Sequence, residues 1–149
     1  MTNEPTHPLT VDPALPRARL DAALADARAL VARLGHEGRH HVAATVLTAK
    51  GTYTGINLEC TLPRGSICAE AVAIGAASAA EPGAPVLFAV AVNRRGEVIP
   101  PCGACRELLA DFGPASAIAV AEDRDGVLRL ASLRALLPET YKAHLRFPT

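Results

Sequence analysis

The sequence has no excess of charge of either sign, and this limits what the chain can bind. Its 149 residues contain 15 Lys plus Arg and 15 Asp plus Glu, and aromatic residues make up only 3%. No stretch is rich in Lys or Arg, and none interleaves basic with aromatic side chains. Because binding to a phosphate backbone needs such a cationic surface, the composition argues against a nucleic acid as partner.

The sequence also lacks an apolar run of membrane-spanning length. Its longest apolar stretches, such as residues 86–92, have the length of a strand, whereas a membrane helix needs roughly 20 apolar residues. The first 15 residues are polar and carry prolines at positions 5, 8 and 13, unlike a secretory signal peptide. We therefore expect no membrane partner and a cytoplasmic location.

The remaining composition is that of one globular domain. Half of the residues are apolar, which is enough to bury a core in a chain of this length. Residues 1–15 lack apolar periodicity and contain several prolines. We expect a disordered or loosely attached leader over residues 1–15 and a single domain over residues 16–149.

Apolar spacing within that domain predicts alternating helices and strands. From residue 17, apolar residues recur at helical spacing up to Gly35, a residue type that often follows a helix end. Residues 41–49 and 52–58 are rich in β-branched side chains and predict a hairpin. We further expect helices over residues 67–80 and 102–111, strands over residues 85–93, 117–121 and 127–130, and a short helix from Ser132 to near Pro138. This order predicts a three-layer α/β/α fold, in which helices cover both faces of a mixed five-stranded sheet.

Cysteine is scarce, yet three of the four cysteines stand at predicted helix starts. They occur in the stretches Cys68-Ala69-Glu70 and Pro101-Cys102-Gly103-Ala104-Cys105. A reducing cytoplasm disfavours disulfides, and the dipole of a helix N-terminus stabilises thiolates. Since paired thiolates select zinc among the common cellular metals, the three cysteines are predicted to hold Zn²⁺.

The number of ligands distinguishes a catalytic zinc site from a structural one. A structural site fills all four positions with protein atoms, whereas a catalytic site keeps one for a water molecule, whose pKa falls to about 7. Three cysteines, with Glu70 two residues after Cys68, favour the catalytic case, in which Glu70 moves protons. The alternative is a zinc-stabilised binding module without catalysis, in which Cys60 supplies a fourth sulfur.

These motifs resemble the signature of the zinc nucleoside deaminases in the cytidine deaminase superfamily, in which a ligand and Ala-Glu precede Pro-Cys-x-x-Cys. Residues 53–59 are similar to that family's aromatic-x-Gly-x-Asn-x-Glu segment. The resemblance implies a cytidine-deaminase-like fold, with hydrolysis of cytidine or deoxycytidine to uridine or deoxyuridine and release of ammonia. It also implies that Asn57 and Glu59 bind the ribose 3′-hydroxyl and that Glu70 holds the pyrimidine N3.

The family resemblance further implies a homotetramer whose subunits complete one another's active sites. Tyr141 matches a C-terminal aromatic residue that lies over the bound base, and Ala69 joins the expected substrate-binding residues. Because a buried Glu59 carboxylate would need a donor, we expect a nucleoside to react better than a free base.

The substrate stays open between two branches of the family. Residues 134–138 resemble blasticidin S deaminase as much as cytidine deaminase, so another aminonucleoside is the alternative substrate. The spacing from Asn57 to Cys68 and the presence of Glu59 look like cytidine deaminases.

Three residues depart from the cytidine deaminase pattern. His40 stands in place of a base-stacking Phe, Pro63 in place of an aromatic residue, and Ala71 in place of an Arg that offsets thiolate charge. Arg64 is a candidate for that missing charge.

Overall fold

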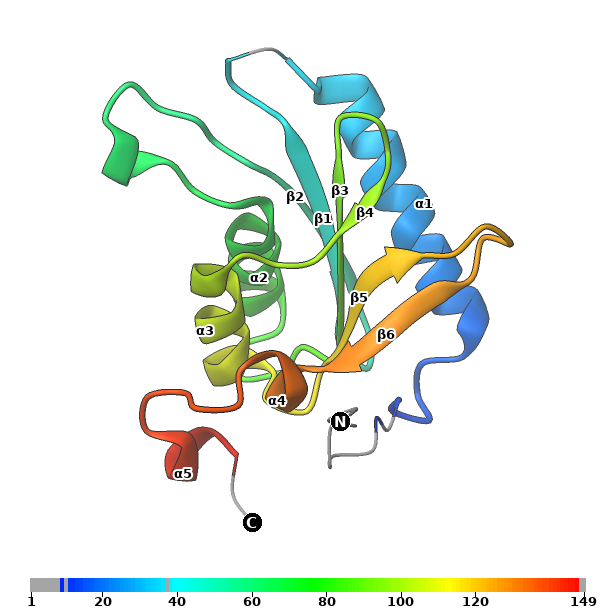
Figure 1. Ribbon diagram of the computed structural model, residues 1–149, viewed down its shortest axis with the longest axis vertical. Helices are drawn as coiled ribbons and strands as arrows, with labels where there is room; N and C mark the ends of the chain where they lie inside the picture. The colour runs from blue at the N-terminus through cyan, green and yellow to red at the C-terminus, as the bar shows by residue number, and fades with distance from the viewer. Residues whose placement is uncertain (1–8, 10, 37, 148–149) are drawn as a thin grey trace, which may run out of the picture.

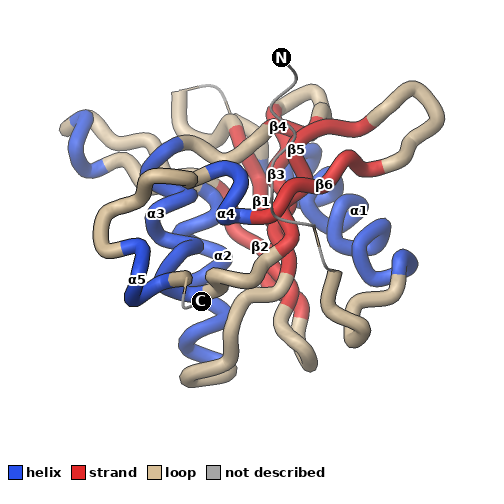
Figure 2. Tube along the Cα trace, turned by 60° about the horizontal axis from the view of Figure 1, so that its bottom comes forward, coloured by secondary structure: helices blue, strands red, loops and turns tan. Residues whose placement is uncertain are grey.

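A computed structural model of the chain describes residues 9, 11–36 and 38–147, and they form three layers. Helix α1 (Arg17–Leu34) covers one face of a central sheet. Helices α2 (Ala69–Ala80) and α3 (Gly103–Phe112) lie on the opposite face, as Figures 1 and 2 show. The predicted α/β/α architecture is confirmed.

The sheet is mixed, as predicted. Its strands are β1 (Val42–Leu47), β2 (Thr52–Ile56), β3 (Phe88–Asn93), β4 (Val98–Ile99), β5 (Ala117–Glu122) and β6 (Leu128–Ser132). The order is β2-β1-β3-β5-β6, and β3 and β5 form its parallel pair. The five strands along this path were expected. The two-residue strand β4 is an addition, which pairs antiparallel with β3 and is too short to leave a sequence pattern.

The helix predictions hold to within two residues at the ends of the three main helices. The second helix begins at Ala69 and not at residue 67, because the backbone of Ile67 pairs with Leu58 in an isolated bridge. Ser132 caps α4 (Leu133–Leu136) as expected, since its Oγ accepts a hydrogen bond from the Ala135 N–H at 3.2 Å. A single-turn helix α5 (Ala143–Arg146) was not predicted.

Strand β3 forms the centre of the core because both of its faces are buried. Phe88, Val90 and Val92 pack with the apolar side of α1. The alternating Ala89 and Ala91 belong to the clusters on the side of α2 and α3. Burial on both faces explains why the strand is a continuous apolar run and not an alternating one.

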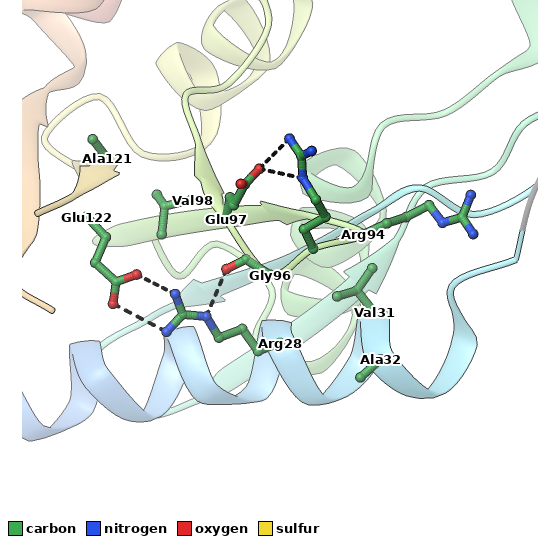
Figure 3. A pocket seen from close by; sticks show the side chains of 10 residues that line it. Arg28, Val31, Ala32, Arg94, Gly96, Glu97, Val98, Ala121 and Glu122 are labelled. Atoms are coloured by element: carbon green, nitrogen blue, oxygen red, sulfur yellow. Dashed lines mark hydrogen bonds and ion pairs between the residues drawn. The ribbon is translucent and has the colours of Figure 1, made fainter. Parts of the chain in front are cut away.

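The α1 layer is also fixed by polar contacts at the far end of the sheet. Arg28 donates to the carbonyl oxygen of Gly96 at 2.9 Å and pairs with Glu122, as Figure 3 shows. The residues around this contact line a hollow of about 580 Å³. Because Arg28 and Glu122 satisfy each other, we assign this hollow a structural role.

The predicted leader is only partly within the described residues. Residues 1–8 and 10 lie outside them, so the domain boundary at residue 16 stays a prediction. Leu15, only 4% exposed, joins the cluster under α1, and Val11 packs against that cluster. The last part of the leader is therefore attached to the core. Within the described part of the chain, no helix has both the length and the hydropathy of a membrane span.

Gly55 allows strand β2 to approach the first turn of α2 closely. A Cβ atom at this position would lie 2.4 Å from the Ala69 carbonyl oxygen and 2.5 Å from the Ala73 nitrogen. Both are backbone atoms, which cannot rotate aside. The start of α2 therefore depends on the absence of a side chain at Gly55.

We expect Gly55→Ala to destabilise the protein by about 1–3 kcal/mol, because the added methyl group overpacks this contact. Metal binding should weaken as well, since the displaced helix end begins at Cys68. The control is Gly75→Ala on the exposed side of α2, where a Cβ meets nothing within 4 Å. That variant should gain about 0.5–1 kcal/mol from helix propensity. Denaturant unfolding of the two variants measures both effects, and equal effects would contradict the argument.

Candidate active site

The three predicted cysteine ligands come from the starts of two neighbouring helices. Cys68 is the N-cap residue of α2, and Cys102 is the N-cap residue of α3. Cys105 lies in the first turn of α3 and is buried. The chain enters α2 and α3 from the same side (Figure 1), so their N-termini present sulfur to one place.

The sulfur geometry fits a single metal ion. The Sγ atoms of Cys68, Cys102 and Cys105 all lie within 4.8 Å of one another. The distance from Cys68 Sγ to Cys102 Sγ is 3.7 Å, and two sulfurs on a tetrahedral zinc ion with bonds of about 2.3 Å would lie about 3.8 Å apart. These cysteines could hold a metal ion, and they form the one such group of His, Cys, Asp or Glu side chains in the described ranges.

The surroundings of the thiols resist ionisation unequally. Burial raises the pKa of the Cys105 thiol, and the nearby Glu70 carboxylate raises it further. Burial is also the largest cause that raises the pKa of Cys68. For Cys102 burial acts in the same direction, but hydrogen bonding from the Cys105 backbone and thiol outweighs it and lowers the pKa. Since metal ligation needs thiolates, a metal ion bound here would displace protons, and its affinity would increase as the pH rises.

Glu70 lies in the first turn of α2, two residues after Cys68, and is only 6% exposed. Its carboxylate has no hydrogen-bond or ion-pair partner among the residues that the structure describes. Its position beside the cysteine group suits proton transfer with a bound ligand or water.

A cavity of about 210 Å³ adjoins the cysteine group. Most of the predicted site residues line it, together with apolar side chains that could cover the faces of a flat ring. The lining residues are Val42, Asn57, Glu59, Ser66, Ile67, Cys68, Ala69, Glu70, Ile99, Pro100 and Cys102. The structure thus gathers residues predicted for metal binding, catalysis and sugar binding around one cavity. This cavity is smaller than the hollow beside Arg28, but the predicted site residues line it.

Asn57 and Glu59 form a connected pair in the cavity wall. The Oδ1 atom of Asn57 accepts hydrogen bonds from the backbone N–H groups of His41 at 2.6 Å and Val42 at 2.9 Å. Its Nδ2 atom donates to Glu59 Oε1 at 3.3 Å. The expectation that Glu59 is buried is wrong for the single chain, because Glu59 is exposed on the loop that follows β2.

Tyr141 is not brought to the cavity within one chain. Its side chain is 72% exposed and borders a different hollow, beside Lys142 and Arg146. The assignment of Tyr141 to substrate binding stays a prediction that concerns a second subunit.

The other residues that the sequence singled out lie outside the metal group. The Cys60 thiol donates to the Leu62 carbonyl oxygen at 2.8 Å. His40 Nδ1 lies 2.7 Å from the Asn57 carbonyl oxygen, so its ring has a backbone partner. Arg64 is exposed in the 3-10 turn Pro63–Gly65 and does not line the cavity.

Sequence reasoning missed Arg106, which directly follows Cys105. Its guanidinium donates to the carbonyl oxygens of Pro101 at 2.9 Å and Leu136 at 3.1 Å. These bonds hold the turn before Cys102 against the end of α4. An Arg immediately after a ligand was the available signal, but its distant partner could not be read from the sequence.

Known proteins with a similar sequence define the class of this chain. Residues 20–97 match the model of the LmjF365940 subfamily of CDD/CDA-like deaminases. Over 119 residues the chain is 31% identical to blasticidin-S deaminase from Bacillus cereus. The aligned region covers 74% of this chain and 84% of the relative. The chain therefore belongs to the CDD/CDA-like deaminases of the cytidine deaminase superfamily.

Solved structures with the same fold lead to the same class. Cytidine deaminase from Mycobacterium tuberculosis is 26% identical, with a TM-score of 0.69, over 82% of this chain and 96% of that one. Cytidine deaminase from Burkholderia pseudomallei is 28% identical, with a TM-score of 0.67, over 81% and 98%. Membership of this class makes the chain a hydrolytic deaminase of nucleoside-type substrates.

We expect Cys60→Ala to keep the full metal content, about one zinc ion per chain, because Cys60 lies outside the sulfur group. Cys105→Ala should lose most of the metal, since it removes one of only three protein ligands. Metal analysis after dialysis against a weak chelator measures both variants. Loss of zinc from Cys60→Ala would instead support a closed structural site with four sulfurs.

Proposed function

We propose that the protein is a zinc-dependent hydrolase that converts cytidine or deoxycytidine to uridine or deoxyuridine with release of ammonia. The observation that carries the proposal is the buried Glu70 carboxylate, which lies two residues from Cys68 in the wall of the cavity. A structural zinc site has no need of an unpartnered carboxylate beside it, whereas a hydrolytic site needs a proton carrier there.

The three cysteines would hold zinc, which when bound supplies a Lewis acid that makes a water molecule nucleophilic near neutral pH. Glu70 takes the proton from this nucleophile and delivers it to N3 of the pyrimidine ring. It then passes the remaining proton of that water to the leaving amine. A bond from C4 to the water oxygen forms first, and the bond from C4 to the exocyclic amine nitrogen then breaks, so water enters and ammonia leaves.

The sugar would be recognised by the paired side chains of Asn57 and Glu59. Asn57 Nδ2 donates one of its two N–H groups to Glu59, so the second can donate to a sugar hydroxyl. Glu59 can accept the proton of that same hydroxyl. A donor and an acceptor side by side match one hydroxyl group, which supports a nucleoside over a free base.

A second candidate substrate is blasticidin S, which the 31% identity to the Bacillus cereus blasticidin-S deaminase supports. The retained Glu59 and the sugar-binding pair favour cytidine or deoxycytidine. A screen of cytidine, deoxycytidine, cytosine and blasticidin S by ultraviolet absorbance distinguishes these candidates. Turnover of blasticidin S alone would overturn the choice of cytidine.

The proposal includes a homotetramer, in which Tyr141 of one subunit reaches the cavity of another. Tyr141 is 72% exposed, so its ring is accessible to a second subunit. Sedimentation of the purified protein tests the assembly, and a monomer at micromolar concentration would contradict it.

We expect Glu70→Gln to keep the fold and the zinc but to lose more than about 100-fold in kcat, because the amide cannot accept and return a proton. Steady-state kinetics on cytidine, with zinc content and circular dichroism measured on the same sample, test this. Substantial activity in a zinc-loaded variant would remove Glu70 from its role.

We also expect cytosine to react more slowly than cytidine in the wild type, since the free base has no sugar hydroxyl and so cannot form the hydrogen bonds to Asn57 and Glu59. Glu59→Ala should reduce this preference by lowering kcat/KM for the nucleosides while changing that for cytosine little. The measurement is kcat/KM for all three substrates in both proteins. An unchanged ratio in Glu59→Ala would show that the carboxylate does not bind the sugar.

A further inference from the structure

We propose that Ser66 is a positioning residue that fixes the Glu59 carboxylate and so sets the preference for substrates with a sugar. This inference rests on the proposed function, since it concerns the sugar-binding side of the same cavity. Ser66 lines that cavity together with Asn57 and Glu59. It belongs to none of the motifs by which the sequence identified the site.

The hydrogen bonds of Ser66 define the direction in which its hydroxyl acts. The Oγ atom accepts from the backbone N–H of Cys60 at 3.2 Å. It lies 3.0 Å from Glu59 Oε2. Because a carboxylate oxygen can only accept, the Ser66 hydroxyl must donate its hydrogen bond to Glu59. The acceptor bond from the backbone holds the hydroxyl in place while it does so.

The backbone explains why Ser66 stands opposite Glu59. Leu58 and Ile67 exchange two backbone hydrogen bonds, of 2.8 Å and 2.9 Å, and so close the base of the loop between them. In an antiparallel bridge the next residues inward face each other, and these are Glu59 and Ser66. The loop that leads to Cys68 thus places a hydroxyl against the carboxylate.

Glu59 needs such a contact because it has few other restraints. It is exposed in the single chain, so packing does not fix its rotamer. It forms no ion pair with a described residue, and the guanidinium of Arg39 donates to its backbone carbonyl oxygen instead. Its other side-chain contact, from Asn57 Nδ2, is longer at 3.3 Å. Ser66 therefore makes the shorter of the two contacts that orient the carboxylate.

An oriented carboxylate binds a hydroxyl at a lower entropic cost than a mobile one. Each immobilised side chain lowers affinity when its freedom is lost on binding, and a residue that restricts it beforehand removes part of that cost. The benefit reaches only ligands that contact Glu59. Ser66 should therefore affect nucleosides and leave the free base unchanged, a distinction that a general effect on folding would not produce.

The test compares Ser66→Ala with Ser66→Thr, which retains a hydroxyl, and with Ser78→Ala in α2, a serine that is half-buried like Ser66, as the matched control. We expect Ser66→Ala to lower kcat/KM for cytidine about 3- to 10-fold, mainly through KM. The value for cytosine, the zinc content and the melting temperature should stay as in the wild type. Ser66→Thr should restore most of the loss, and Ser78→Ala should change none of these quantities. If cytosine turns over too slowly, inhibition by uridine and by uracil replaces the two rates.

A second comparison isolates the route through Glu59. In the Glu59→Ala background, Ser66→Ala should have no further effect on cytidine, because the two residues act as a unit. Additive losses, an equal loss for cytosine, loss of zinc, or no effect of Ser66→Ala would each overturn the role of Ser66 alone. Absence of turnover of any nucleoside by the zinc-loaded wild type would overturn the proposed function together with this role.

Discussion

The site depends on the N-termini of α2 and α3, which must lie next to each other. Cys68 and Cys102 are the N-cap residues of α2 and α3, and both have the extended backbone conformation of such residues. Neither carries the side-chain oxygen of the Ser, Thr, Asn or Asp residues that stabilise this position best. The positions that would stabilise the helices are used for sulfur, and the helix dipoles act on thiolates instead.

Packing contacts fix the position of each of these helix starts. Gly55 lets the backbone of β2 touch the backbone of Ala69, which fixes the height of α2 on the sheet. Arg106 fixes the start of α3 from the other side through the carbonyl oxygens of Pro101 and Leu136. Because β2 also leads directly into Asn57, one packing contact places Cys68 and the proposed sugar-binding pair relative to each other.

Local sequence patterns were sufficient to predict the main helices, the strands and the cysteine group. The spacing of apolar residues predicted α1 and the central strands, and the two cysteine motifs predicted the sulfur group that the structure gathers within 4.8 Å. The exposure of Glu59 and the contact of Ser66 were not predictable in this way. Both follow from the bridge between Leu58 and Ile67, which depends on the path of a loop and not on periodicity. The partner of Arg106 is 30 residues away in the chain, beyond the reach of any local motif.

The charge distribution of the cavity also bears on the substrate. No Lys, Arg or His is among the described residues that line the cavity, whereas Glu59 and Glu70 both line it. Ala71 contributes no charge next to Glu70, and Arg64 does not line the cavity. A phosphate group would therefore meet carboxylates without a compensating cation, at a cost of about 1 kcal/mol or more for each close pair of like charges. An uncharged nucleoside avoids this repulsion and still offers its hydroxyl to Asn57 and Glu59, so the electrostatics and the hydrogen-bonding groups favour the same class of ligand.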